Sequence, residues 1–150
     1  MTKQKPVPLF EHLGIRLHRA YEAWLHALVE EMNAAGHDWF TQGRATLIGH
    51  VPRDGCRQAD LLGRTGWTKQ ALQQMLDGLE RQDVLQRRVD PNDKRGRLVE
   101  LTDKGWAALA DADRIKRDLS ARFERKLGPE ALAQLENLLD AMVADAEPTQ

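Results

Sequence analysis

One short segment, residues 84–102, restricts the fold more than any other part of the chain. It reads VLQRRV, then DPNDKRG, then RLVELT. The outer runs resemble strands, and the middle run holds proline, asparagine, aspartate and glycine, which favour turns. The segment therefore predicts a β-hairpin, whereas apolar residues in the rest of the chain follow helical spacing.

Helical spacing dominates the part of the chain that precedes this hairpin. Apolar residues recur every three or four positions across residues 9–32, which predicts one long helix. Its apolar stripe is wider than a helix with one solvent-facing side needs, so we expect part of it to pack against a second chain. A short helix that Thr41 can cap should follow, in the segment that closes at Pro52.

Residues 56–80 predict two short helices joined by a turn at Gly66, with Thr68 as the N-cap of the second helix. A helix-turn-helix followed by a charged hairpin can place its second helix in the major groove of DNA. The leucines and Met75 of that helix should face inward. At 100° per residue, the side chains that then point outward are Gln70, Gln74 and Asp77, with Lys69 and Gln73 on the flanks.

Helices are also expected after the hairpin. Thr102 can cap a helix that runs to Gly128, and Pro129 suits the first position of a last, leucine-striped helix. The predicted fold class is therefore mainly α with a small β-hairpin wing. Residues 1–150 should form a single domain, because this length supports one hydrophobic core.

Composition indicates the cellular compartment of the protein. The single cysteine excludes a disulfide framework and fits a reducing compartment. No apolar run approaches the roughly 20 residues of a membrane span, and the first residues, MTKQKPVPLF, contain no apolar signal region. We therefore expect a soluble, cytoplasmic protein without a membrane partner.

Charge is nearly balanced over the whole chain, at 22 basic and 23 acidic residues, but it is distributed unevenly. Residues 86–97 carry five basic and two acidic side chains, whereas residues 128–150 carry five acidic side chains and no basic one. This asymmetry favours a polyanion partner near the hairpin. Taken alone, a charged run is more often only a solvated surface.

The basic hairpin tip suggests how such a partner would be held. Arginine at a narrow tip can enter the minor groove of DNA. Asp93 lies two residues before Arg95 and could hold its guanidinium extended through a forked ion pair. The competing interpretation is an ordinary polar tip, and the outward glutamines taken alone also fit a solvated helix face. Glutamine can nevertheless bond adenine through two hydrogen bonds.

The run WTKQALQQMLDGLERQDVLQRRVDPNDKRGRLVELTDKG resembles the core of the MarR family of winged helix-turn-helix repressors. The likeness lies in the helix-to-wing run, the DP-x-D-x-R wing and the L-T-x-K-G that opens the next helix. It implies a winged helix-turn-helix at about residues 41–103, flanked by N- and C-terminal dimerisation helices. Gly78 departs from the family pattern, in which a longer polar residue is usual. By this similarity the recognition helix carries Thr68, Lys69, Gln70, Gln73 and Gln74, and the wing carries Asp93 and Arg95.

The expected function is therefore sequence-specific binding of double-stranded DNA by a transcriptional regulator, acting as a homodimeric repressor. Basic side chains near the two reading elements should contact phosphates, which positions the protein without reading sequence. These predicted phosphate contacts are Arg57, Arg64, Arg81, Lys94 and Arg97.

The terminal helices should form the dimer, in helical regions at residues 9–33 and 104–145. A monomer of this layout would leave both apolar stripes partly exposed, although an intrachain core accounts for some of the leucines. A two-fold dimer would read an inverted-repeat operator whose half-sites lie about one helical turn apart. The predicted dimer residues are Leu9, Phe10, Leu13, Leu17, Leu132, Leu135, Leu138, Leu139 and Met142.

The resemblance also implies a small, often aromatic or phenolic effector, or an oxidant, that loosens DNA binding from a cleft between the dimer helices and the winged domain. Tryptophans at helical spacing are more often core residues, and lone histidines more often have a structural role. The five histidines include no i, i+4 pair, so we expect no metal site and no cofactor. The effector candidates are His12, Arg16, Trp24, His37, Trp39, Phe40 and His50.

Two other functions compete with DNA binding. A hydrolase would pair Cys56 as nucleophile with His50 as base, but it lacks a third orienting group and a glycine-rich oxyanion loop. A helical interaction module would use the wing to contact a protein. Arg57 and a helix start beside Cys56 favour its thiolate, as a redox sensor requires. Relatives that sense oxidants tend to carry their cysteine in the first helix, so we favour a packed, inert Cys56.

Overall fold

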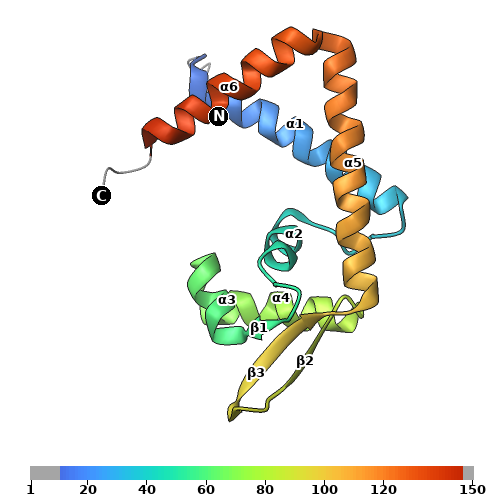
Figure 1. Ribbon diagram of the computed structural model, residues 1–150, viewed down its shortest axis with the longest axis vertical. Coiled ribbons are helices and arrows are strands. Elements are labelled where there is room, and N and C mark those ends of the chain that lie inside the picture. Colours follow the sequence, from blue (N-terminus) through green and yellow to red (C-terminus); the bar gives the residue numbers. More distant parts are fainter. Residues whose placement is uncertain (1–10, 147–150) are drawn as a thin grey trace, which may run out of the picture.

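The computed structural model describes residues 11–146, which form helices and one small sheet that projects at one end of the molecule (Figure 1). No helix in that range is long and apolar enough to cross a membrane. The helices are α1 (Leu13–Ala34), α2 (Gln42–Gly49), α3 (Gln58–Thr65), α4 (Lys69–Arg81), α5 (Asp103–Leu127) and α6 (Pro129–Ala146). The strands are β1 (Cys56–Arg57), β2 (Leu85–Asp90) and β3 (Asp93–Leu101).

Three threonines cap helices, as the sequence predicts. The hydroxyl oxygens of Thr41, Thr68 and Thr102 each accept a hydrogen bond from the backbone N–H three residues later, at 3.2–3.4 Å. Each cap satisfies one of the amides that a helix start leaves without a partner. The turn between α3 and α4 is made by Gly66, whose φ of 65° lies in the left-handed region that glycine tolerates.

Several predicted boundaries were wrong. The long first helix begins at Leu13, and the predicted residues 9 and 10 lie outside the described part of the chain. The hairpin strands extend to Asp90 and Asp93, so only residues 91 and 92 form the turn, where the sequence predicted a turn of seven residues. Ladder pairing along β2 and β3 outweighs the turn preference of the individual residues in this segment.

The sheet has three strands in the order β1-β3-β2, whereas the sequence predicted only the two strands of the hairpin. Cys56 and Arg57, which were predicted to open a helix, instead pair antiparallel with Val99 and Leu98 of β3. A two-residue strand has no period of its own, so the partner strand decides its conformation. The strand β1 ties the start of α3 to the base of the wing.

One hydrophobic core holds α4, the sheet and α5 together. Leu72, Leu76 and Leu79 of α4 are fully buried in it, together with Val84 and Val99 at the sheet. The N-terminal turn of α5 approaches the chain before β2 so closely that a Cβ atom on Gly105 would lie 2.2 Å from the Val84 carbonyl oxygen. Because Gly105 has no side chain, the start of α5 can lie directly against the backbone before β2.

The long helix α5 spans the molecule (Figure 1). At one end it adjoins the sheet, and farther along it is crossed by α1, which packs against it (Figure 1). At its other end the chain turns at Gly128 into α6, which contacts α5. The winged part of the molecule and α6 therefore lie at opposite ends of α5 (Figure 1).

Candidate nucleic-acid interface

The outer face of α4 is polar and free of protein cover. Its inner residues Leu72, Leu76, Gly78 and Leu79 are buried, whereas the residues predicted to read DNA are exposed. The exposed set comprises Thr68, Lys69, Gln70, Gln73 and Gln74. The inward and outward faces of α4 therefore lie as the helical period predicts, apart from Asp77, which is half-buried.

Gly78 has a packing role that explains the departure from the family pattern. The guanidinium of Arg44, on α2, crosses α4 at this position and donates to the Trp39 carbonyl oxygen at 2.8 Å. A Cβ atom on Gly78 would lie 3.0 Å from Arg44 Nη2. Glycine lets α2 and α4 pack closely, which offsets part of the roughly 1 kcal/mol that glycine costs within a helix.

A groove of about 570 Å³ lies between the outer face of α4, the helix α3 and the wing. Lys69 and Gln73 line it from α4, and Arg95 and Arg97 line it from β3. Gln58, at the start of α3, lines the same groove. The structure therefore brings two predicted recognition residues, one predicted wing residue and one predicted phosphate contact to one basic surface.

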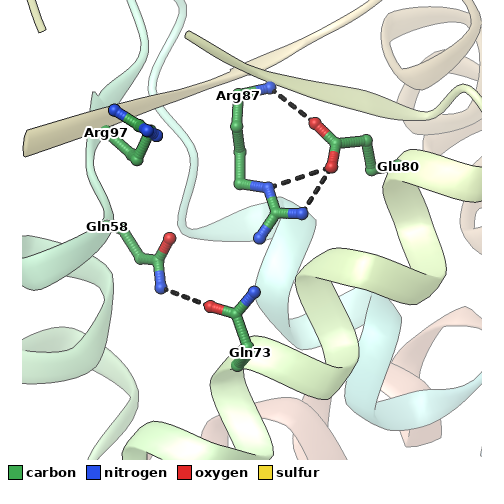
Figure 2. A pocket seen from close by; sticks show the side chains of 5 residues that line it. All are labelled: Gln58, Gln73, Glu80, Arg87 and Arg97. Carbon is green, nitrogen blue, oxygen red and sulfur yellow. Dashed lines mark hydrogen bonds and ion pairs between the residues drawn. The ribbon is translucent and has the colours of Figure 1, made fainter. Parts of the chain in front are cut away.

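A second pocket shares Gln58, Gln73 and Arg97 with this groove and is also lined by Glu80 and Arg87 (Figure 2). A chain of hydrogen bonds begins there with the bond between Gln58 and Gln73 that Figure 2 draws. Gln58 Nε2 donates to Gln73 Oε1 at 3.0 Å, and Gln73 Nε2 donates to Asp77 Oδ1 at 2.8 Å. Asp77 Oδ1 also accepts from Arg87 Nη2 at 2.7 Å. The residues Gln58, Asp77 and Arg87 thus surround a predicted recognition residue. The sequence predicted that Asp77 points outward but assigned no role in binding to Gln58 or Arg87.

Arg87 is held mainly by Glu80 of α4 (Figure 2). Its backbone N–H donates to Glu80 Oε1 at 3.0 Å and its Nε to Glu80 Oε2 at 3.1 Å, with a further ion pair from Nη2. The hydrogen bond from Arg87 lowers the pKa of Glu80, and the bond to Glu80 raises the pKa of Arg87. Arg87 is therefore a charged, structural link between α4 and β2.

The wing uses its aspartates differently from the prediction. Asp93 Oδ1 accepts from the backbone N–H of Arg95 at 3.0 Å, and no ion pair joins the two side chains in the described structure. The predicted fork between Asp93 and the Arg95 guanidinium was therefore wrong, because this carboxylate turns back onto the tip backbone. The Arg95 side chain is exposed.

Asp90 is the buried acid of the wing, with 2% of its surface exposed. Its Oδ1 accepts from the backbone N–H of Asn92 at 2.8 Å, which shapes the turn. Arg57 of β1 forms an ion pair with its Oδ2, the distance to Nε being 2.8 Å. Arg57, predicted as a phosphate contact, is thus already paired, although half of its side chain stays exposed.

The other predicted phosphate contacts fall in different places. Arg64 Nη1 donates to the His50 carbonyl oxygen at 3.0 Å, which commits part of its guanidinium. Lys94 is exposed at the tip beside Arg95, and Arg81 is exposed at the C-terminal end of α4. Lys69 begins α4 and Arg81 ends it, so Arg81 lies at the opposite end of the helix from the groove residue Lys69.

None of the seven predicted effector residues lines either of the two pockets beside α4. Trp39 and Phe40 are core residues with 3% and 2% of their surface exposed. His37 is buried and its Nε2 lies 2.9 Å from Asp111 Oδ2 of α5, a bond that lowers the pKa of Asp111. His12 caps α1 with its side chain. Trp39 and Phe40 are therefore core residues, and His37 and His12 have structural roles.

The remaining effector candidates stay at least partly accessible. Arg16 is exposed on α1, where it pairs with Glu11. Trp24 is half-buried, and its ring stacks on Tyr21 with centroids 6.4 Å apart. His50 is half-buried at the end of α2.

Apolar side chains remain uncovered at the end of the molecule that holds α6. Leu13 on α1 is 59% exposed and Leu138 on α6 is 57% exposed. Leu17 and Leu132 are half-buried, and Leu9 and Phe10 lie outside the described residues. The other exposed members of the predicted dimer set are Leu135, Leu139 and Met142, and Phe123, Leu127 and Val143 extend the same surface.

Cys56 lacks the surroundings of a nucleophile. It is buried in strand β1, and burial raises the pKa of its thiol. A reactive cysteine needs the opposite shift, because the thiolate is the attacking species. The packed interpretation of Cys56 therefore agrees with the structure.

Comparison with known proteins places this geometry among transcriptional regulators. A model of the MarR family matches residues 45–96. The chain is 34% identical over 116 residues to the HTH-type transcriptional regulator PetP of Rhodobacter capsulatus, a match that covers 73% of this chain and 66% of PetP. The chain thus spans about two thirds of the length of that relative.

Two solved structures of E. coli MarR resemble the whole described fold. The reduced form aligns with a TM-score of 0.74 at 25% identity, covering 89% of this chain and 97% of that chain. A mutant MarR complexed with operator DNA aligns with a TM-score of 0.67 at 26% identity, covering 87% of this chain and 92% of that chain.

Proposed function

Because this chain belongs to the MarR family of winged-helix, DNA-binding transcriptional regulators, we propose that it acts as a homodimeric repressor of an inverted-repeat operator. The outer face of α4 would lie in the major groove, where each base pair shows a distinct pattern of donors and acceptors. The wing would reach the neighbouring minor groove with Arg95. Its place of action would be the cytoplasm, together with the DNA it controls.

The groove between α4 and the wing is the observation that carries this proposal. Lys69 and Gln73 of α4 line the same groove as Arg95 and Arg97 of β3. Base-reading amides beside guanidinium groups suit a duplex, since the amides can meet base edges while the cations meet phosphates. The apolar part of the lining consists of Ala59, Leu62 and Leu72, whereas Lys69, Arg95 and Arg97 give the groove three cations and no acid, which favours a polyanion over a protein partner.

The exposed apolar surface on α6 and the adjoining parts of α1 and α5 supports the dimer. Leu138 and Val143 are 57% and 63% exposed, which is unfavourable for side chains of this size in water. A second copy of the chain would cover this surface through a two-fold contact. That symmetry would present two α4 helices to two half-sites of one duplex.

A small aromatic effector is a further part of the proposal. It would bind where α1 of the dimer faces the winged region, near Trp24 and Arg16, which remain accessible in the chain. Binding there would change the spacing of the two α4 helices. A panel of phenolic and benzoic acids that never releases the bound duplex would remove this part of the proposal.

The test is selection of bound duplexes from a random pool, followed by titration of the selected duplex at several salt concentrations. We expect an inverted repeat with half-sites about one helical turn apart. We also expect affinity to fall with salt, by roughly 0.9 in the log–log slope for each phosphate contact. Binding that ignores salt, or a selected pool without a repeat, would contradict the proposed function.

A further inference from the structure

Gln73 differs from the other two glutamines on the outer face of α4. Both polar atoms of its amide are engaged, Oε1 by Gln58 and Nε2 by Asp77. Gln70 and Gln74 are exposed and make no side-chain hydrogen bond within the described residues. The protein therefore determines the orientation of one recognition amide and leaves two others free to rotate.

Asp77 sets the direction in which the Gln73 amide points. An ionised carboxylate accepts hydrogen bonds and cannot donate one, so the neighbouring atom of Gln73 must be the NH₂ group. Arg87 keeps Asp77 in place through a 2.7 Å bond to the same Oδ1. Arg87 is in turn held by Glu80, and only 17% of its side chain is exposed.

Gln58 supports the same orientation from the other side. Its Nε2 donates to Gln73 Oε1 at 3.0 Å, as Figure 2 shows. A flipped Gln73 amide would place oxygen against oxygen at Asp77, which is repulsive, whereas the Gln58 amide has no second partner within the described residues and can turn to follow Gln73. Asp77 therefore fixes the orientation of the Gln73 amide before DNA binds, and Gln58 adds a bond that restricts its movement.

We propose that Gln73 reads an adenine in each half-site and that Asp77 and Gln58 are positioning residues that set its amide for this base. The inference rests on the proposed DNA-binding function. With these two bonds made, the Gln73 amide still has one N–H and one oxygen lone pair. Adenine shows one acceptor, N7, and one donor, N6–H, in the major groove, whereas guanine shows two acceptors there.

Preorganisation explains what the Asp77 and Gln58 contacts contribute. A free glutamine must lose rotamer freedom when it meets a base, and it can present donor and acceptor in either order. Gln73 has lost that freedom already in the unbound protein. The fixed Gln73 amide therefore discriminates better than a freely rotating amide would. It discriminates against a base edge that presents donor and acceptor in the reverse order.

The experiment begins with the inverted repeat that the unaltered protein selects from a random pool. Selection is then repeated with Gln73→Ala, and affinity is measured for duplexes in which one A·T pair per half-site is changed to G·C. We expect the unaltered protein to prefer adenine at one position by about tenfold or more. Gln73→Ala should remove that preference.

Three variants test the positioning roles. Asp77→Asn can accept or donate, so we expect the adenine preference to fall by at least about threefold, and Asp77→Glu, which keeps an acceptor-only group, should restore part of it. Gln58→Ala should weaken the preference without breaking any ion pair. If circular dichroism shows that Asp77→Asn does not fold, Gln58→Ala alone tests the positioning role. Gln82→Ala is the control, because Gln82 is an exposed glutamine that follows α4 and lines neither pocket, and it should leave the preference at this position unchanged.

The outcomes separate this inference from the function on which it rests. If the unaltered protein selects no repeat, the DNA-binding mechanism fails as a whole. If it selects a repeat and Gln73→Ala keeps every base preference, Gln73 is not a reader and only the inference fails. If Gln73→Ala loses the preference while Asp77→Asn and Gln58→Ala both keep it, the positioning roles are overturned.

Discussion

The arginines near the wing differ in what they already bind. Arg57 pairs with buried Asp90, Arg87 with Glu80 and Asp77, and Arg88 with Glu100. Arg95 has no side-chain partner within the described residues and lies exposed at the tip. Part of the basic charge of residues 86–97 therefore stabilises the fold. The basic charge that remains available to a partner is concentrated at the tip of the wing.

Replacing Arg95 with alanine should weaken operator binding by about 1 to 3 kcal/mol. The side chain makes no contact that folding needs, so the thermal unfolding midpoint should not change. Fluorescence anisotropy with the selected operator measures the first effect and circular dichroism the second. Arg125→Ala, which removes one exposed positive charge from α5, is the control. Equal affinities of Arg95→Ala and the unaltered protein would exclude the wing from the mechanism.

Elements are joined at two places that local sequence does not reveal. Glu80 and Arg87 connect α4 to β2, and Gly105 lets α5 start against the carbonyl oxygen of Val84. Thr102 adds to the second junction, since its hydroxyl donates to the Asp83 carbonyl oxygen at 2.6 Å. The recognition helix is thus anchored to the wing and to the long helix at its C-terminal end.

The link between Glu80 and Arg87 should make part of the stability sensitive to acid. The pKa of Glu80 is lowered in the folded protein, so its contribution is complete above the ordinary glutamate pKa of about 4.3 and is lost as the pH falls through the folded value. Glu80→Gln should therefore be less stable at pH 7, by about 1 kcal/mol or less because Glu80 is partly exposed. Urea denaturation should show this difference shrinking below about pH 4. A constant difference across that range would contradict the assignment.

Gly105→Ala should destabilise the fold by about 1 to 3 kcal/mol, because the new Cβ atom meets a backbone oxygen that cannot move aside. The free energy of unfolding from urea denaturation measures the effect. Gly63→Ala in α3 is the matched control, since a Cβ atom there meets nothing within 4 Å. It should leave stability unchanged or raise it by up to about 1 kcal/mol. Equal effects of the two substitutions would show that the close approach at Gly105 is not what matters.

The whole molecule separates two tasks along α5 (Figure 1). The winged part lies at one end, and the exposed apolar surface of α6 lies at the other. A dimer formed through α6 would fix the distance between two distant α4 helices. Any change in the angle of α5 would alter that distance, so the dimer end can control binding at the winged end without touching DNA.

Leu138→Asp should convert the protein from a dimer to a monomer, because it places a charge in the centre of the surface that a second copy would bury. Sedimentation velocity measures the change in mass. Operator affinity should fall by about a hundredfold or more, since the half-sites would no longer be bound jointly. Asn137→Asp adds the same charge at the neighbouring position and should keep the dimer. A Leu138→Asp protein that remains dimeric would place the interface elsewhere.

The sequence by itself determined the helices, the caps at Thr41, Thr68 and Thr102, the hairpin and the family. These features depend on residues within a few positions of one another, where helical period, capping and turn chemistry act. The inner and outer faces of α4 follow from the same period, so the exposed recognition residues were also predictable.

Only the tertiary structure decided which long-range partners these residues meet. Gln58 reaches Gln73, Arg87 reaches Asp77, Arg57 reaches Asp90, and β1 pairs with β3. Each of these pairs joins separate elements, so no period or spacing along the chain indicates it. The burial of Trp39 and Phe40, which sequence could assign to a cleft or to the core, was settled in the same way. Local chemistry selects the elements, and packing between elements selects the contacts that hold an amide or an arginine in position.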